Sequence, residues 1–331
     1  MKKIIFLVVA TLLTLIVTSC KKEDWIEKIT NPAIDYVSTS YGKITVYHNV
    51  GEGAYGLAVD QSNNVWVPNS FKKNITKITP DNQMITYNIG KTSYGVVSDG
   101  KNIFLANQYE ENAMKMDPNG NTITTYKNVG DNPWGIILNK GNILTANYDG
   151  NDVTQIDPDG KKISYLVGAN PSALTSDGLN IYTANSGDSS VSKITPEGII
   201  KYDHIGIQPI SIAADNKGNA WVADYVGNRV YKISATGIIS SCYIGPVGPH
   251  AITYDSINNC AWTANYYNSL SRVSDDMILT TYNGITGNGI TGHPWAITLG
   301  KPDGDYTIIW VAGFITVDTG IVSKISIINK K

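Results

Sequence analysis

The residues most able to do chemistry in this sequence are Asn and Asp side chains that follow short apolar runs. The stretch "TANYDGN" (145–151) has a near copy, "TANYYNS" (263–269), and related text stands at 105–109, 183–187 and 222–226. Amide and carboxylate oxygens bind divalent cations, and amides also hydrogen-bond neutral ligands. The same residues shape turns at the ends of strands. Because one such residue recurs in nearly every copy of the repeat described below, we favour the structural role for the Asn side chains.

Other chemical motifs are few. No P-loop, CxxC motif or Ser-His-Asp order occurs in the 331 residues. After Cys20 the sequence contains only Cys242 and Cys260, which fall at opposite ends of their expected strands, so we expect isolated thiols rather than a disulfide. His250 and His293 flank prolines near the ends of expected strands, where an imidazole could act as an acid or a base.

An internal repeat governs the chain. Its "P-x-G-I" segments recur in steps of about 38 to 40 residues, with a final step of 45, and are marked by Tyr55, Tyr94, Pro133, Pro171, Pro209, Pro249 and Pro294. The fourth copy contains four short strand patterns, at 172–177, 180–185, 190–196 and 198–202, separated by Gly, Asp and Pro turns. Four strands repeated seven times predict an all-β fold, a seven-bladed β-propeller with four-stranded blades.

The two ends of the repeat region complement each other. The seventh copy stops after its third strand (320–328), whereas "YGKITVY" (41–47) resembles the fourth-strand text "PEGIIKY" (196–202). We therefore expect residues 41–47 to complete blade seven and close the ring, so that the propeller comprises residues 41–331. Large side chains in each second strand should pack between blades: Trp66, Phe104, Leu144, Tyr182, Trp221, Trp262 and Trp310.

One face of such a propeller should carry the candidate site, because strand one begins where strand two ends. The strand-two ends form a ring of Asn69, Asn107, Asn147, Asn185, Asp224, Asn265 and Gly313. Aromatic rings above this collar suit a neutral polar ligand. We predict that ligand contact is made by Tyr55, Tyr94, Trp134, His250, Trp295, Tyr148, Tyr225 and Tyr266. The Gly-rich connection 283–292 lies on the same side and is either a flexible rim or a plain insertion.

The N-terminus predicts export. Lys2 and Lys3 precede an apolar or hydroxyl run over 4–18, and "VTSC" (17–20) resembles a lipobox. We expect a signal peptide at 1–19, lipidation of Cys20, a tether over 20–40 and attachment to the outer membrane or cell surface. Removing the two lysines changes the net charge from −2 to −2 − 2 = −4, which argues against nucleic acid as a partner. We expect a monomer.

Units such as "PWGIILNKGNILTANYDGNDVTQIDPDGKKISY" (133–165) resemble the NHL, YVTN and streptogramin-lyase (virginiamycin B lyase) propellers over residues 41–331. These propellers include lyases, lactonases, interaction platforms and surface proteins. A lyase-like activity implies an acid–base histidine, for which His250 and His293 are candidates, and metal-binding carboxylates. The collar of lyase-like repeats commonly reads Thr-Glu where this sequence reads Ala-Asn.

A lactonase-like activity implies a divalent ion, Ca²⁺ or Mg²⁺, held between acidic and amide side chains. Asp224 with Asn185 or Asn147 could supply part of such a set. A single carboxylate is a weak ligand set, so we favour a binding or interaction module for a glycan, peptide or envelope protein over a metal-dependent enzyme.

Overall fold

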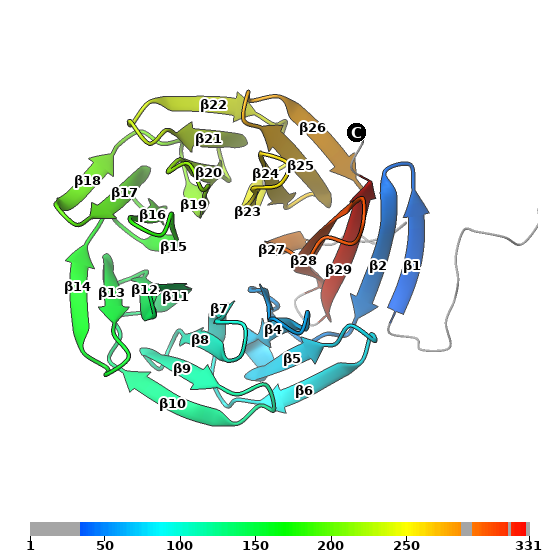
Figure 1. The fold of residues 1–331 in the computed structure, drawn as a ribbon, viewed down its shortest axis with the longest axis horizontal. Coiled ribbons are helices and arrows are strands. Elements are labelled where there is room, and N and C mark those ends of the chain that lie inside the picture. The colour runs from blue at the N-terminus through cyan, green and yellow to red at the C-terminus, as the bar shows by residue number, and fades with distance from the viewer. Residues whose placement is uncertain (1–33, 286–292, 317–318, 329–331) are drawn as a thin grey trace, which may run out of the picture.

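The computed structural model describes residues 34–285, 293–316 and 319–328. Seven antiparallel sheets are arranged as blades around a central axis (Figure 1). In each of blades one to six, consecutive strands pair with each other, as expected from the hairpin turns of the repeat. The predicted seven-bladed β-propeller with four-stranded blades is confirmed.

The bounds follow the repeat closely. Blade one comprises β3 (Ala58–Val59), β4 (Val65–Asn69), β5 (Asn74–Ile78) and β6 (Met84–Asn88). Blade two comprises β7 (Ser93–Ser98), β8 (Ile103–Asn107), β9 (Asn112–Met116) and β10 (Thr122–Lys127). Blade three comprises β11 (Pro133–Asn139), β12 (Asn142–Asn147), β13 (Asp152–Ile156) and β14 (Lys162–Leu166). Blade four comprises β15 (Pro171–Ser176), β16 (Ile181–Asn185), β17 (Ser190–Thr195) and β18 (Gly198–Tyr202). Blade five comprises β19 (Pro209–Ala214), β20 (Ala220–Asp224), β21 (Arg229–Ile233) and β22 (Ile239–Tyr243). Blade six comprises β23 (Pro249–Asp255), β24 (Cys260–Asn265), β25 (Ser269–Ser274) and β26 (Leu279–Asn283). A short 3₁₀ turn, η1 (Ser70–Lys72), follows β4.

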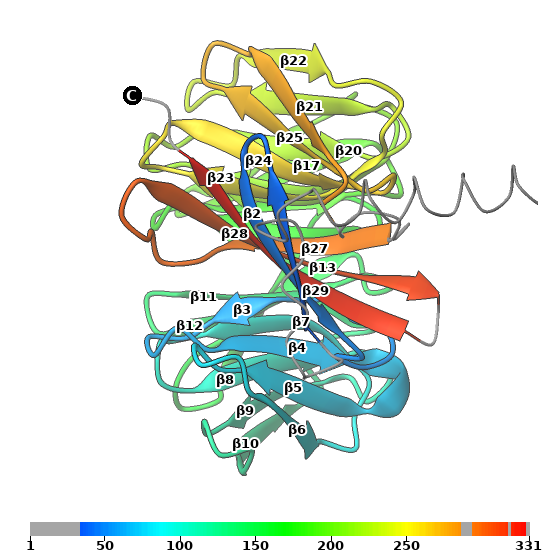
Figure 2. The ribbon, with the colours of Figure 1, turned by 90° about the vertical axis from the view of Figure 1, so that its right-hand side faces the viewer.

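Blade seven joins the two ends of the chain. Its strands β27 (His293–Leu299), β28 (Tyr306–Thr316) and β29 (Thr319–Ile328) are completed by β2 (Gly42–His48), with Ile44 opposite Ile325. Figure 2 shows the blue β2 beside the red β29. The N-terminal strand therefore closes the ring as predicted, and it pairs with the β29 edge that would otherwise be open.

The structure adds a strand that the sequence analysis did not expect. Residues 34–39, assigned above to the tether, form β1 (Ile34–Thr39), which pairs with β2 and makes blade seven five-stranded. Ile34 lies opposite Tyr47 in this pairing and is only 5% exposed. The tether assignment is corrected at these residues, because the apolar side chain of Ile34 finds a place in the core beside Tyr47.

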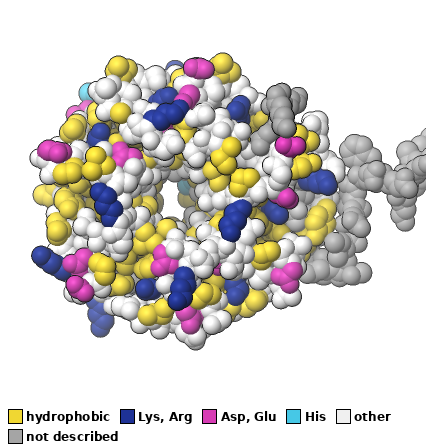
Figure 3. All heavy atoms as spheres, viewed as in Figure 1, with side chains coloured by type: hydrophobic (Ala, Val, Ile, Leu, Met, Phe, Trp, Pro, Cys, Tyr) yellow, Lys and Arg dark blue, Asp and Glu magenta, His cyan; other side chains and the backbone are white. Residues whose placement is uncertain are grey.

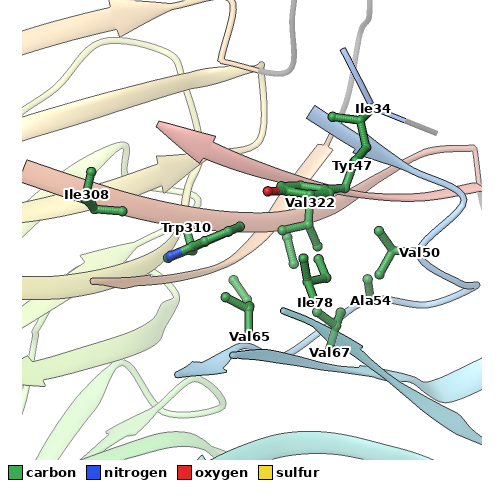
Figure 4. Packing of buried hydrophobic residues seen from close by; sticks show 12 residues of the cluster. Ile34, Tyr47, Val50, Ala54, Val65, Val67, Ile78, Ile308, Trp310 and Val322 are labelled. Carbon is green, nitrogen blue, oxygen red and sulfur yellow. The ribbon is translucent and has the colours of Figure 1, made fainter. Parts of the chain in front are cut away.

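The hydrophobic core is divided into clusters, several of which lie between adjacent blades. Figure 4 shows the cluster at the ring closure, where Tyr47 and Trp310 of blade seven meet Val65 and Ile78 of blade one. The large second-strand side chains are buried, which confirms their expected packing role: Trp66, Phe104, Leu144, Tyr182, Trp221, Trp262 and Trp310. Burying aromatic side chains of this size contributes strongly to stability.

Two further observations bear on the sequence predictions. Cys242 and Cys260 are both free thiols, as expected, the first half-buried and the second buried. In the part of the chain that the structure describes, no helix is long and apolar enough to span a membrane.

Candidate ligand site in the central channel

The side chains that face the channel are placed there by irregularities in the first strand of each blade. In blade three, Pro133 pairs with Asn147 and Gly135 with Ala146, so Trp134 is an extra residue without a partner in β12. The same register shift occurs beside Ser172, Ile210, His250 and Trp295. A β-bulge redirects the side chain of its extra residue. The bulges therefore mark the residues that line the channel.

These residues surround a cavity of about 470 Å³. In each blade the residue that follows the bulge position of the repeat is small, and these small residues form the next tier of the lining: Gly56, Gly95, Gly135, Ala173, Ser211, Ala251 and Ala296. The residue after each small one is aliphatic and forms a further tier of the lining: Leu57, Val96, Ile136, Leu174, Ile212, Ile252 and Ile297. The small tier permits close packing around the axis, since a Cβ on Gly56 would come 2.5 Å from the carbonyl oxygen of Tyr94. Figure 3 shows that the centre of one face of the molecule is hollowed.

A continuous arc of rings forms most of the upper wall. Tyr94 stacks on Tyr55 at 4.5 Å between ring centroids and on Trp134 at 5.6 Å. Trp134 in turn stacks on Tyr148 at 4.0 Å. In the other direction, Tyr55 meets the edge of Trp295 at 5.0 Å. The rings are half-buried and hold one another in place, which presents a preformed aromatic surface to the cavity.

The arc continues through blade six. Trp295 contacts His250 at 3.9 Å between ring centroids, and His250 contacts the ring of Tyr225 at 5.5 Å. Seven of the eight predicted ligand residues therefore line one cavity, the exception being Tyr266. Tyr266 contacts Tyr225 at 5.9 Å and stacks on His293 at 4.1 Å outside the cavity wall. The Nδ1 atom of His293 lies 3.2 Å from the carbonyl oxygen of Tyr266.

The arc is interrupted at blades four and five. There the upper wall consists of Ser172, Ser186, Gln208 and Ile210, which were not predicted as ligand residues. Ser172 Oγ donates to the carbonyl oxygen of Ile210 at 2.9 Å, which ties the two blades together. The signal that could have found this sector was the absence of an aromatic residue at positions 172 and 210 of the repeat. The cavity thus has a broad aromatic wall and a narrower wall of small and polar side chains.

Among the described residues that line the cavity, one is a histidine, His250. Burial lowers its pKa to about 4, partly offset by a hydrogen bond with the backbone of Trp295. Its Nδ1 atom is buried and has no hydrogen-bond partner within the described parts of the chain. At neutral pH the ring is therefore an uncharged imidazole, one nitrogen of which makes no hydrogen bond to the described residues.

The Asn collar does not face the channel. None of the side chains of Asn69, Asn107, Asn147, Asn185, Asp224 and Asn265 is exposed, and none of them lines the cavity. Asn185 Nδ2 donates to Ser190 Oγ and Ser192 Oγ, both at 3.0 Å, and Thr183 Oγ1 donates to Asn185 Oδ1 at 2.8 Å. These amides therefore do not form the expected collar at the channel mouth. They tie the second strand to the third, in keeping with the structural role favoured for them above.

The connection between blades covers these amides from the other side. A Cβ on Gly130 would lie 2.0 Å from Asn147 Nδ2, and a Cβ on Gly168 would lie 2.5 Å from Asn185 Nδ2. Asn147 Nδ2 itself donates to Asp152 Oδ1 at 2.9 Å and Thr154 Oγ1 at 3.0 Å. A side chain enclosed in this way has no open position for a ligand, so the collar has a structural role.

Asp224 is the acidic residue at a repeat position where most blades have Asn, and the reason lies in its own blade. The third strand of its blade offers Arg229 and Tyr231 where blade four offers Ser190 and Ser192, so an amide donor would find no equivalent hydroxyl acceptors there. The carboxylate instead accepts hydrogen bonds at Oδ1 from the backbone N–H groups of Ile207 (3.1 Å), Gln208 (2.8 Å) and Gly227 (3.2 Å). The carboxylate of Asp224 thus holds the loops around it through backbone hydrogen bonds and does not face the channel.

A sequence model of the virginiamycin B lyase family matches residues 39–320. The chain belongs to this family. No curated protein sequence matches it. Among solved structures, a streptogramin B lyase has a TM-score of 0.72 and 20% identity, covering 85% of this chain and 98% of that one.

Two solved structures of another lyase show the same fold. Virginiamycin B lyase from Staphylococcus aureus, in selenomethionine form, has a TM-score of 0.71 and 21% identity, covering 86% of this chain and 100% of its own. A catalytically inactive variant of that enzyme, solved with quinupristin, has a TM-score of 0.72, 22% identity and the same coverage. At these identities the likeness concerns the fold.

The metal implied by the family resemblance does not fit the described channel. Its described lining residues include no Asp or Glu, and the described residues contain no group of three or more His, Cys, Asp and Glu side chains placed to hold a metal ion. Asn147, Asn185 and Asp224, the candidate ligands, are enclosed as described above and do not meet in the cavity. Residues 286–292 of the Gly-rich connection and Cys20 lie outside the described residues.

Proposed function

We propose that this protein is an envelope-anchored binding module whose channel takes a neutral ligand with a flat or C–H-rich ring. The observation that carries the proposal is the arc from Tyr148 through Trp134, Tyr94, Tyr55 and Trp295 to His250, which lines a cavity of about 470 Å³. Cavities of this size, mostly apolar with a few polar groups, are typical of small-molecule sites.

The chemistry of the wall supports a neutral ligand. None of the described lining residues is Asp, Glu, Lys or Arg, and His250 is uncharged at neutral pH because burial lowers its pKa to about 4. A charged ligand group would lose its hydration without meeting an opposite charge, which is costly. Gln208 and Ser186 in the wall can instead hydrogen-bond hydroxyl or amide groups. A sugar ring or the face of a cyclic peptide meets these requirements.

Attachment to the envelope is supported by the sequence alone, through the signal segment 1–19 and the lipidation motif at Cys20. The folded part begins by Ile34, so about 13 residues separate it from the proposed lipid. That length lets the propeller stand off the membrane surface with its channel accessible.

A lyase-type enzyme is the second candidate. It is favoured by membership of the virginiamycin B lyase family together with the unpartnered Nδ1 of His250 in the cavity. A neutral imidazole at neutral pH can accept a proton from a bound substrate. Because the described lining residues include no carboxylate to assist an elimination, we rank this candidate second to binding.

The test uses the intact protein with two probes, quinupristin and a set of neutral oligosaccharides, in equilibrium titrations. We expect one probe class to bind, and Trp134→Ala and Trp295→Ala each to weaken binding at least about tenfold, as expected for central aromatic contacts. Tyr267→Ala is the matched control, since Tyr267 is 66% exposed and does not line the cavity. Unchanged affinity in both Trp variants would rule out the channel as the site.

Chromatography of each bound probe after incubation separates the two candidates. A binding module returns the probe unchanged. A lyase converts it to a new product, and His250→Ala abolishes the conversion while the protein stays folded. Conversion by the wild type that His250→Ala does not affect would exclude His250 as the base.

A further inference from the structure

A second cavity lies outside the channel, between blades six and seven. It has a volume of about 620 Å³, and its lining includes Tyr41, Trp262, Arg272, Tyr282, Ile327 and Ile328. The lining comes from the β1–β2 turn, the end of β29 and three strands of blade six. We call it the closure cleft, because it forms where the N-terminal strands complete the ring. A volume of this order accommodates a small organic molecule.

The closure cleft contains an arginine, Arg272, at a repeat position that carries arginine in no other blade. Trp262, Arg272 and Thr280 lie opposite one another across β24, β25 and β26. The residue that corresponds to Arg272 is lysine in five of the other six blades and glutamine in the remaining one: Lys77, Lys115, Gln155, Lys193, Lys232 and Lys324. Arginine differs from lysine in offering a planar fork of donors that matches a carboxylate.

The guanidinium of Arg272 is largely unused by the protein. Its Nε donates to Cys260 Sγ at 3.3 Å, and none of the ion pairs among the described residues includes it. Burial raises the pKa of the Cys260 thiol to about 11, so the sulfur is protonated and carries no compensating charge at neutral pH. The half-buried guanidinium therefore has donors available for an anion from solution.

Trp262, which lines the cleft, has a donor without a partner among the described residues. In blades one and five the indole Nε1 donates to an aspartate, Trp66 to Asp60 Oδ2 at 2.9 Å and Trp221 to Asp215 Oδ2 at 3.3 Å. Trp262 is only 2% exposed, yet its Nε1 makes no hydrogen bond within the described residues. Leaving a buried donor unpaired is unfavourable, and a ligand acceptor would remove this penalty.

The reason is a longer turn. Trp262 follows Asp255 by seven residues, whereas Trp66 follows Asp60 and Trp221 follows Asp215 by six. Asp255 accepts from the backbone N–H of Ile257 and from the backbone and side chain of Asn258, as Asp60 and Asp215 do in their own turns, but it receives no hydrogen bond from Trp262 Nε1. Trp310 of blade seven also has an unpartnered Nε1 in the described structure, but it does not line the closure cleft.

The remaining walls indicate what the anion carries. Tyr41 and Tyr282 meet edge to face at 5.1 Å, and Tyr282 contacts Trp262 at 5.4 Å. Ile327 and Ile328 add aliphatic surface. One guanidinium and one indole N–H can satisfy the two oxygens of a monoanion, while the aromatic and aliphatic walls cover an apolar body. A doubly charged phosphate would be compensated by only one positive charge.

We propose that the closure cleft binds a small monocarboxylate with an apolar or aromatic body, its carboxylate held by Arg272 and by the indole N–H of Trp262. This site is separate from the channel, so it stands or falls independently of the function proposed above.

The experiment titrates the intact protein with 4-phenylbutyrate, using calorimetry, and compares 4-phenylbutyramide and inorganic phosphate. We expect the acid to bind and the amide to bind at least about tenfold more weakly, because the amide lacks the charge that strengthens the hydrogen bonds. Arg272→Gln should abolish binding, and Arg272→Lys, the residue found in five other blades, should weaken it about tenfold. Trp262→Phe should weaken binding severalfold by removing Nε1 alone.

Lys193→Gln is the matched control, since Lys193 occupies the equivalent position in blade four and should leave binding unchanged. The proposal is overturned if the acid does not bind, if the amide binds equally well, or if Arg272→Gln retains full affinity. Phosphate binding that depends on Arg272 without carboxylate binding would overturn the ligand class. Arg272→Lys keeps the test decisive if Arg272→Gln does not fold, since five blades already accommodate lysine there.

Discussion

His250 and Trp295 are in contact across the boundary between blades six and seven, with ring centroids 3.9 Å apart and an angle of 53° between the planes. Both are the extra residues of β-bulges, and both line the channel. The contact buries the imidazole among apolar groups, which disfavours its charged form and lowers the pKa of His250 to about 4. Channel geometry and protonation are thus coupled at this pair.

A pH dependence of stability follows. Between about pH 6.5 and pH 4 the unfolded chain binds a proton at His250 that the folded protein does not. The free energy of unfolding should therefore be constant above pH 6.5 and fall as the pH decreases through this window, by at most about 3 kcal/mol. Urea unfolding at several pH values measures it. His250→Gln should remove this part of the dependence, and a constant difference between wild type and variant would contradict the explanation.

Asp224→Asn distinguishes a structural carboxylate from a metal ligand. The substitution weakens the hydrogen bonds from Ile207, Gln208 and Gly227 and places a donor where the carboxylate has Oδ2. We expect a loss of about 1–2 kcal/mol, seen as a lower melting temperature. The loss should be the same with and without Ca²⁺. A Ca²⁺-dependent stabilisation of the wild type that the variant lacks would instead support a metal site.

Gly130→Ala tests how tightly the blade connection encloses Asn147. Gly130 has a φ of +121°, and a Cβ there would lie 2.0 Å from Asn147 Nδ2, which would displace the amide from Asp152 and Thr154. Gly141→Ala is the control, because Gly141 also has a positive φ (+81°) but faces open space. Chemical denaturation should show that Gly130→Ala costs about 2 kcal/mol more than the control. Equal costs would mean that only backbone strain is involved.

Truncations test the ring closure. Removing residues 1–40 deletes β1 and the burial of Ile34, a loss of about 1.5–3 kcal/mol, and should leave a folded monomer. Removing residues 1–49 also deletes β2, which exposes the edge of β29 and takes Tyr47 out of the core at the closure. Size-exclusion chromatography and circular dichroism should show aggregation or unfolding for the longer truncation. A folded monomer after that truncation would show that β2 is dispensable.

The sequence by itself determined the architecture. Each repeat contains its own strand alternation and turn residues, so four strands per copy and seven copies follow from local patterns. The closure by residues 41–47 could be predicted because the same text occurs in complete copies. The aromatic residues of the channel could be predicted too, since a repeat position that carries Tyr55, Tyr94, Trp134 and Trp295 is visible in the alignment of copies.

What only the tertiary structure decided is which polar groups are available. The sequence favoured a structural role for Asn147 and Asn185 but left ligand binding open. Their hydrogen-bond partners come from the third strand and their covering glycines from the connection that precedes their blade, so they are enclosed. Conversely, Trp262 resembles an ordinary core residue in the sequence, and the longer turn after Asp255 accompanies an indole N–H that has no partner among the described residues. The physical reason is the same in both cases: a polar side chain is available to a ligand only when no neighbouring strand or turn satisfies it, and those neighbours are brought together by the fold.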